Sequence, residues 1–198
     1  MSAGMSRQKN EQTKLKILSL VLVGAGLLIF GAVALVVLPK PNPSPEPEVG
    51  ENDQSIAPAR LKETAPELNL IDLEGRQVSL DDYGGQVVLV NNWATWCPPC
   101  RAEMPILEAY YQDHKDEGFV LIGIEAGQPA DEVKEFVNNY GISFPIWLDP
   151  ESKAIIGFRN MALPSSYVID PDGTIVLAWT GAVTLDSLEE YITPMLKE

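Results

Sequence analysis

The sequence Cys97-Pro98-Pro99-Cys100 directly follows an apolar, β-branched run at residues 87–90. The run predicts a strand that is buried on both faces. The prolines suit the first turn of a helix and block any helix before them. This strand–loop–helix unit therefore places both cysteines at the start of a helix and predicts a layered α/β domain.

Alternating patterns of strand and helix continue after this unit. The strand predictions are 119–125, 144–148 and a hairpin of 167–169 with 174–179 around Asp170-Pro171-Asp172-Gly173. The helix predictions are 131–140, stopped by Gly141, and 184–196 with Leu185, Leu188, Ile192 and Leu196 facing inward. We therefore expect a mixed sheet with parallel crossovers and an antiparallel hairpin at one edge.

Residues 17–38 form an apolar run whose only plainly polar member is Ser19. As a helix it would be about 33 Å long, enough to cross a membrane. A cleaved signal peptide is an alternative, because Ala32-Val33-Ala34 resembles a cleavage site. A buried core helix fits poorly, because the run has no polar face. Residues 1–16 are basic, so the head should stay in the cytoplasm and the body outside it.

Within residues 39–59, Pro41, Pro43, Pro45 and Pro47 alternate with polar residues, which is typical of a solvated spacer. Residues 60–198 are then long enough for one globular domain with a core of its own. The whole chain carries 14 Lys and Arg against 28 Asp and Glu, a formal charge of −14. This acidic balance argues against nucleic acid as a partner. It would also steer basic protein clients toward the domain.

Two cysteines and a single histidine cannot fill a structural zinc site, and two cysteines cannot build a disulfide framework. His114, which would lie about 21 Å along the helix from Cys100, is expected at the surface. Cys97 at the helix N-terminus would be stabilised as a thiolate, the form that attacks disulfides. Cys100 shares a helix face with Met104 and Leu107, so we expect an exposed nucleophile, Cys97, and a shielded resolving partner, Cys100. An inert structural disulfide is the alternative, but so short a loop adds little stability.

The sequence Trp96-Cys97-Pro98-Pro99-Cys100 after a hydrophobic strand resembles the thioredoxin superfamily. The form Asn-x-Trp-Ala-x-Trp-Cys-x-Pro-Cys and the anchor resemble its membrane-tethered TlpA/ResA-like branch, over roughly residues 60–198. This resemblance implies a thioredoxin-like fold preceded by a transmembrane helix, with the helix and strand between 127 and 148 as an insertion. It further implies a thiol–disulfide oxidoreductase that needs no cofactor beyond its cysteines.

The resemblance also suggests roles for residues around the cysteines. Pro164 matches the family's cis-proline, so Leu163 and Pro164 are expected to receive the substrate's extended peptide. The alternative is an ordinary trans-proline at the start of a strand. Trp96, beside Cys97, would shield this site and contact the substrate. Glu103 would have a raised pKa and exchange a proton with Cys100. The alternative is a glutamate in the first turns that only complements the helix dipole. Asn91 occupies the place of a buried acid in classical thioredoxins and cannot accept a proton, which favours Glu103 as the proton carrier.

Partners follow from the same resemblance. It suggests a reductant that is recharged by a membrane electron-transfer protein and serves apocytochrome c or other exported dithiols. The pair Pro98-Pro99 does not fix the direction of electron flow. Two other functions are possible for a chain with this cysteine pair. The first is a peroxiredoxin-like thiol peroxidase, which normally has Thr or Ser three residues before its reactive cysteine, where this chain has Ala94. The second is a copper metallochaperone, which would lack a third ligand within reach of the two sulfurs.

Overall fold

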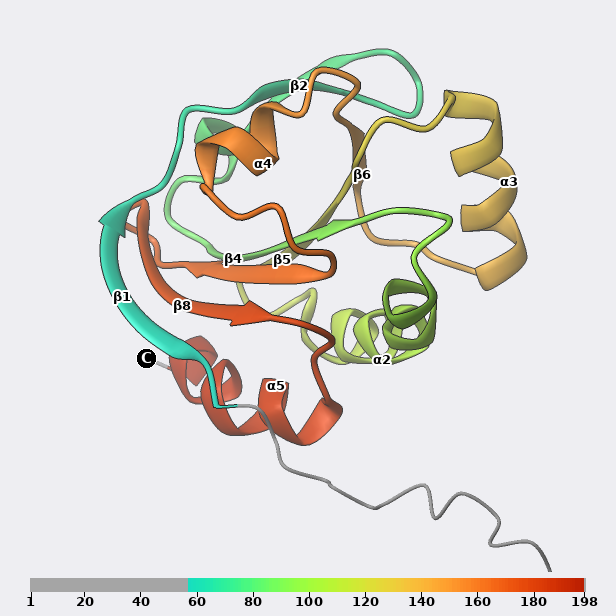
Figure 1. Cartoon of the computed structure of the whole chain (residues 1–198). Coiled ribbons are helices and arrows are strands. Elements are labelled where there is room, and N and C mark those ends of the chain that lie inside the picture. The colour runs from blue at the N-terminus through green and yellow to red at the C-terminus, as the bar shows by residue number, and fades with distance from the viewer. Residues whose placement is uncertain (1–56, 198) are drawn as a thin grey trace, which may run out of the picture. The chain divides into compact units, whose positions relative to one another are not determined.

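The seven residues of β4, Val87–Trp93, are all buried, and this strand lies inside an eight-stranded mixed sheet (Figure 1). The computed structural model describes residues 57–197. Its strands are β1 (Ala59–Thr64), β2 (Asn69–Asp72), β3 (Gln77–Ser79), β4, β5 (Phe119–Glu125), β6 (Ile146–Leu148), β7 (Ser165–Ile169) and β8 (Thr174–Thr180). Its helices are α2 (Pro98–His114), α3 (Ala130–Tyr140), α4 (Lys153–Gly157) and α5 (Leu185–Tyr191), with 3-10 turns η1 (Leu80–Tyr83) and η2 (Thr193–Lys197). This is the thioredoxin-like α/β fold expected from the sequence.

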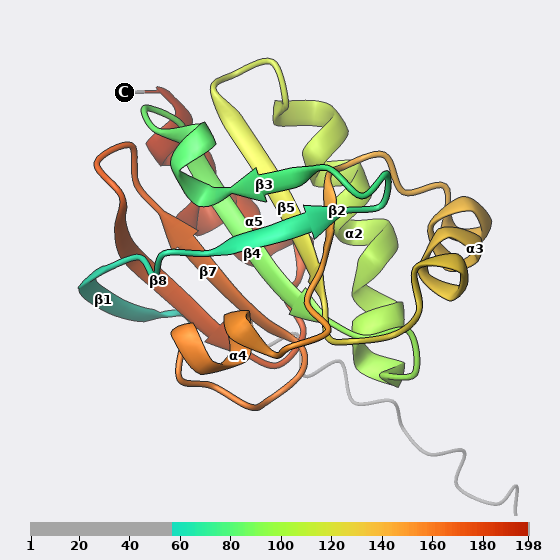
Figure 2. The same ribbon diagram turned by 90° about the horizontal axis from the view of Figure 1, so that it is seen from above.

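The strand order is β1-β8-β7-β4-β5-β6-β2-β3. Strand β4 runs parallel to β5 and antiparallel to β7, so the carboxyl ends of β4 and β5 meet the beginning of β7. Figures 1 and 2 agree in placing α2 and α5 on one face of the sheet and α4 on the other. Because α2 begins directly after β4, the cysteines lie at this end of the sheet.

The sheet separates two hydrophobic cores. On the side of α2 and α5, Trp93 and Leu107 are among the residues with no exposed surface. On the side of α4, Val90 and Ile122 are equally inaccessible. The continuous apolar runs of β4 and β5 thus serve both cores at once, as expected for central strands.

Three expectations from the sequence are wrong in detail. The β7–β8 hairpin is not an edge, because β1 pairs with β8 in antiparallel fashion. The predicted helix 184–196 ends at Tyr191 and continues as a 3-10 turn that contains Pro194, since proline cannot continue an α-helix. Leu185 at the start of α5 is 42% exposed rather than directed inward.

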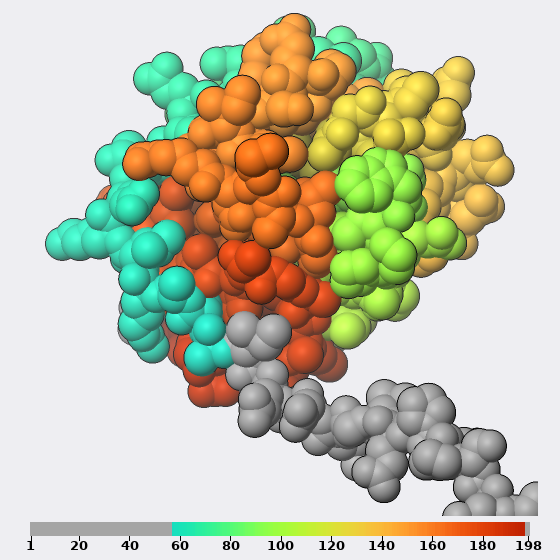
Figure 3. Space-filling view, in the orientation of Figure 1, coloured from blue at the N-terminus to red at the C-terminus, as the bar shows by residue number. Residues whose placement is uncertain are grey.

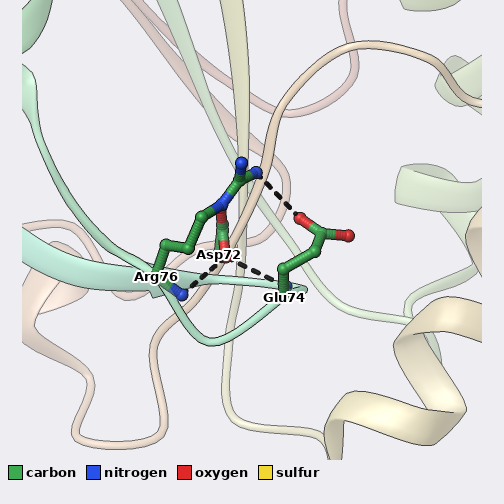
Figure 4. A network of polar contacts seen from close by, with 3 residues as sticks. All are labelled: Asp72, Glu74 and Arg76. Atoms are coloured by element: carbon green, nitrogen blue, oxygen red, sulfur yellow. Dashed lines mark hydrogen bonds and ion pairs between the residues drawn. The ribbon is translucent and has the colours of Figure 1, made fainter.

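The turn between β2 and β3 is held by a polar network (Figure 4). One carboxylate oxygen of Asp72 accepts the backbone N–H groups of Glu74 and Arg76, each at 2.9 Å. The Arg76 guanidinium donates to the other oxygen at 2.6 Å and to Glu74 at 3.1 Å. Gly75 has φ +80°, a conformation that glycine adopts without strain.

The expected transmembrane helix at 17–38, the basic head and most of the spacer lie outside the described residues. Within residues 57–197, none of the helices combines the length and the apolar character that membrane crossing requires.

Candidate active site

Cys97 and Cys100 form a disulfide at the junction of β4 and α2, with their Cα atoms 5.3 Å apart. The expectation that Cys97 is exposed is wrong, because only 3% of its surface is accessible, against 0% for Cys100. Cys97 is the N-cap residue of α2, and its Sγ accepts the backbone N–H of Cys100 at 3.3 Å. The side chain therefore folds back against the helix instead of projecting into solvent.

The two prolines determine how many helix donors reach Cys97. Pro98 and Pro99 occupy the first positions of α2 and carry no N–H group. The N–H of Arg101 is bonded to the carbonyl oxygen of Cys97 at 3.1 Å. Cys100 therefore supplies the only N–H of the first turn that is left for a side chain, and the sulfur of Cys97 receives it.

Glu103 lies one turn after Cys100 in α2 and is 1% exposed. One of its carboxylate oxygens accepts the side-chain amide of Asn91 and the other the backbone N–H of Val183, each at 2.9 Å. Burial raises the pKa of Glu103 to about 7, although both hydrogen bonds oppose the rise. Burial thus gives Glu103 the raised pKa that the sequence predicted.

The asparagines of β4 point to opposite faces of the sheet. Asn91 donates its side-chain amide to Ser166 at 3.0 Å as well as to Glu103. Asn92 donates to Ser165 at 3.4 Å, on the side of α4. The side-chain oxygens of both asparagines are buried without a hydrogen-bond partner. Asn91 thus connects β7 to the carboxylate of Glu103.

The peptide bond between Leu163 and Pro164 is cis, as the resemblance implied. Ser165 pairs with Asn92, which places this peptide bond beside the loop that carries Cys97. Leu163 is partly buried against the core cluster that contains both cysteines. The carbonyl oxygen of Pro164 accepts the N–H of Gly181 at 2.9 Å.

Trp96 is 62% exposed next to the disulfide. The structure thus places Cys97, Cys100 and Glu103 at the same end of the sheet as Trp96 and the Leu163–Pro164 peptide.

Sequence reasoning missed Glu125, which closes β5 in register with Trp93 and has no exposed surface. One of its carboxylate oxygens accepts the N–H of Gln128 at 2.7 Å, and the other has no partner. Burial raises its pKa, against the opposing effect of the N–H groups of Gln128, Thr95 and Gly127. The signal in the sequence was the acidic residue that ends the apolar run FVLIGIE. An acid that continues a buried strand is rare unless it is paired, so it marks a position worth attention.

The expectation that His114 is a surface residue is wrong, since it is only 9% exposed. Its Nδ1 lies 2.8 Å from Glu117 and its Nε2 lies 3.4 Å from Glu189 of α5. Its ring also packs against Tyr110, with 4.4 Å between the ring centroids. His114 therefore joins the end of α2 to α5 and takes no part in the site.

A disulfide at the start of a helix, backed by a buried carboxylate with a pKa near neutrality, can cycle between dithiol and disulfide. The fold and this site together define a thiol–disulfide oxidoreductase. Residues 61–178 match the AhpC/TSA family, and the chain belongs to that family.

Known proteins of similar sequence carry the same activity in their names. The thiol-disulfide oxidoreductase ResA of Bacillus anthracis is 38% identical over 133 residues, which cover 67% of this chain and 77% of that protein. ResA of Geobacillus kaustophilus is 33% identical over 129 residues, 65% of this chain and 74% of its own.

Solved structures agree with this assignment. A thiol:disulfide interchange protein of the thioredoxin family from Chlorobium tepidum aligns with a TM-score of 0.62 and 25% identity, over 70% of this chain and 99% of its own. The thioredoxin domain of a thiol-disulfide oxidoreductase from Bacteroides vulgatus aligns with a TM-score of 0.61 and 27% identity, over 68% of this chain and 96% of its own. The enzyme class expected from the sequence is thereby confirmed.

Proposed function

We propose that the protein is a membrane-anchored, extracytoplasmic reductant of disulfides in exported proteins. In this proposal Cys97 is the nucleophile, Cys100 resolves the mixed disulfide and Glu103 carries the proton of Cys100. The observation that carries the proposal is the buried Glu103 carboxyl group, one helical turn from Cys100 on α2.

The proposed cycle starts from the dithiol. The Cys97 thiolate attacks a client disulfide, so a bond forms between Cys97 and one client sulfur while the other leaves as a thiolate and takes up a proton. Glu103 then removes the proton of Cys100. The Cys100 thiolate attacks the Cys97 sulfur and releases the second client thiolate, which is protonated in turn. The client gains two electrons, and the enzyme is left with the disulfide seen in the structure.

Two features support electron flow toward the client. A buried carboxylate behind the cysteines disfavours a thiolate there, which destabilises the dithiol form and strengthens it as a reductant. Only one helix N–H is available to Cys97, which limits the stabilisation of its thiolate. A strong oxidant requires the opposite, a reduced form that is unusually stable.

The location and partners extend the proposal. Residues 17–38 would be the anchor, residues 1–16 the cytoplasmic head and residues 39–59 the spacer. A membrane electron-transfer protein would return electrons to the disulfide. Clients would be exported proteins with cysteine pairs, such as apocytochrome c, bound along Trp96 and the backbone of Leu163 and Pro164.

The reduction potential of the Cys97–Cys100 pair tests the direction of electron flow. We expect a value near that of thioredoxin, about −270 mV, or lower, when the full chain is equilibrated with thiol buffers. A value approaching about −120 mV would mean an oxidant and would overturn the direction. A Cys97→Ser variant should lose turnover and a Cys100→Ser variant should accumulate mixed disulfides, whereas an active Cys97→Ser enzyme would disprove the mechanism.

Cell fractionation tests the anchor. The full chain should sediment with membranes, and its reduced cysteines should react with a membrane-impermeant maleimide in intact cells. A variant that lacks residues 17–38 should do neither. Cysteines that the reagent labels only after cell lysis would contradict the extracytoplasmic location.

A peroxidase is the alternative closest to the family. Its usual hydroxyl group three residues before the reactive cysteine is absent here, because that residue is Ala94. Peroxide consumption by the reduced enzyme, measured beside disulfide reduction, distinguishes the two activities. Titration of the reduced protein with Cu(I) tests the metallochaperone alternative in the same way.

A further inference from the structure

Three segments surround the disulfide and contain no acidic residue: 96–102, 159–164 and 180–185. We call them together the acid-free face. Their lack of acids is unusual in a chain with 28 acidic residues against 14 basic ones. A surface that differs in charge from the rest of its protein is a candidate for specific recognition.

Hydrogen bonds hold the three segments next to one another. The Asn160 side-chain amide donates to Thr180 at 3.1 Å, and the Gly181 N–H donates to the carbonyl oxygen of Pro164 at 2.9 Å. The Val183 N–H reaches Glu103 of α2. In Figure 3 the green start of α2, the orange segment after α4 and the red segment after β8 lie side by side on one face.

The acid-free face is also apolar. The large hydrophobic side chains exposed within residues 57–197 are Trp96 at 62%, Met161 at 87%, Leu185 at 42% and Ile156 at 70%. The first three belong to this face, and only Ile156 lies outside it, in α4. Exposed apolar side chains on segments that adjoin a reactive group indicate contact with a partner.

The only charges on this face are two arginines. The Arg159 side chain is 83% exposed, and its nearest carboxylate, that of Glu63 in β1, is 3.8 Å away. Its φ of 53° lies in the left-handed region, where a glycine would avoid the strain. On the other side, Arg101 donates to the Tyr140 hydroxyl of α3 at 3.1 Å, and no carboxylate within residues 57–197 forms an ion pair with it.

We propose that this face binds an extended client segment in which apolar residues flank the reactive cysteine and acidic side chains pair with Arg101 and Arg159. The inference rests on the proposed function, since it specifies the clients of the same disulfide. Trp96 and Met161 would contact the apolar flanks. The preference for acidic client residues acts at short range. At physiological ionic strength the screening length is about 8 Å, so ion pairs on the acid-free face persist, while the electrostatic field of the acidic residues elsewhere on the domain is weakened.

The test uses three peptides that share one internal Cys-x-x-Cys disulfide. Their flanks are apolar with Glu, apolar with Lys, or Gly and Ser only. The full-length reduced enzyme should show a kcat/KM about five-fold or more higher for the Glu peptide than for the Lys peptide at physiological salt. Equal rates for these two peptides, or a faster Lys peptide, would overturn the inference.

Charge-reversal variants separate local contacts from net charge. In the Arg101→Glu/Arg159→Glu enzyme the Glu-to-Lys ratio should invert. The matched control Lys115→Glu/Lys134→Glu makes the same change in net charge away from the face, and there the ratio should hold. The ratio is taken within each enzyme, so a general loss of activity cancels. An equal change of the ratio in both double variants would assign the preference to the overall charge and reject the face.

The apolar part has its own control. Met161→Ser should lower kcat/KM for both apolar peptides relative to the Gly/Ser peptide, whereas Ile156→Ser, which changes an exposed residue outside the face, should leave this relation as it is. Equal effects of the two substitutions would contradict the role of Met161. Reduction of hydroxyethyl disulfide by the unaltered enzyme reports the proposed function by itself, so its absence would reject that function and not the peptide preference alone.

Discussion

The side-chain amide of Asn91 donates to the carboxylate of Glu103 over 2.9 Å, and both residues are buried, at 0% and 1% exposure. This contact joins the central strand to the helix that carries the cysteines. Asn91 cannot take up a proton, so changes of protonation in this pair fall on Glu103. The burial that makes the contact possible also raises the pKa of Glu103 to about 7.

Substitution of Glu103 by Gln should change how stability depends on pH. The pKa of Glu103 in the folded protein is about 7, above the ordinary 4.5. Its contribution is therefore fully present below about pH 4.5 and is lost as pH rises through about 7, by up to about 3 kcal/mol. Gln does not titrate, so the variant should lack this pH-dependent loss, and the stability difference between parent and variant should shift by up to about 3 kcal/mol in the variant's favour as pH rises from about 4.5 to above 7. Denaturant unfolding across this pH range measures the difference, with the exposed Glu135→Gln as control. Parallel curves for the parent and the Glu103 variant would contradict the shifted pKa.

Replacing Pro99 with Ala should lower the pKa of the Cys97 thiol. The substitution restores an N–H at the second position of α2, which an N-cap side chain can reach. Pro98→Ala restores an N–H at the first position, which does not serve the cap, and is the matched control. Thiolate absorbance of the reduced variants gives both pKa values. This account of the helix donors would be wrong if the pKa of Cys97 shifted equally in the two variants.

Glu125→Gln should be tolerated, because one carboxylate oxygen of Glu125 has no partner and the change removes a buried charge. Asp149 gives the contrast, since both its oxygens accept N–H groups of α4 at 2.8 Å. Asp149→Asn should therefore lose about 1–3 kcal/mol of unfolding free energy at neutral pH. Urea denaturation of the two variants compares them. A larger loss for Glu125→Gln would show that its free oxygen has a partner in solution.

His114→Gln should weaken the contact between α2 and α5 mainly at low pH. Burial lowers the pKa of His114, but its hydrogen bonds with Glu117 and Glu189 outweigh this and raise it above 6.5. The stabilisation is fully present below about pH 6.5 and is lost as pH rises through the folded pKa. We expect the variant to lose about 1 kcal/mol of unfolding free energy below about pH 6.5 and less above the folded pKa, measured by thermal unfolding. A loss that is the same at every pH would assign His114 a purely packing role.

Gly123 of β5 has no room for a side chain. A Cβ atom there would lie 2.8 Å from Ile146 and 3.1 Å from the Trp93 indole nitrogen. Gly123→Ala should destabilise the protein by about 1–3 kcal/mol. Gly84→Ala is the control, because its φ is −52° and a Cβ atom there would lie 3.7 Å from the carbonyl oxygen of Asp81. Calorimetric melting temperatures test this, and equal values for both variants would contradict the close packing.

Local patterns explain what the sequence predicted correctly. The apolar runs of β4 and β5, the prolines at the start of α2 and Gly141 at the end of α3 each specify structure within a few residues. Gly141 has φ +66°, the conformation expected of a glycine that stops a helix. The raised pKa of Glu103 was predictable because its place on the helix directs it into the core.

Other features depend on contacts between distant parts of the chain. His114 is buried because Glu189, 75 residues further on, comes to lie beside it. Strand β1 has almost no buried side chain, so its sequence carries no periodic signal, and pairing with β8 alone defines it. The length of α5 was the avoidable error, since Pro194 was visible in the sequence.

The pairing of β1 with β8 also determines where a label or fusion partner can be attached without obstructing the disulfide. Ala59 lies opposite Ala178, near the end of β8 that neighbours Pro164, so the chain enters at the same end of the sheet as the disulfide. Two strands separate β1 from β4, a lateral distance of about 14 Å. A dye, bead or fusion partner attached just ahead of Ala59 would therefore crowd the reacting sulfurs. The hairpin turn at Asp172, at the opposite end of β7 and β8, offers an attachment point that leaves them clear.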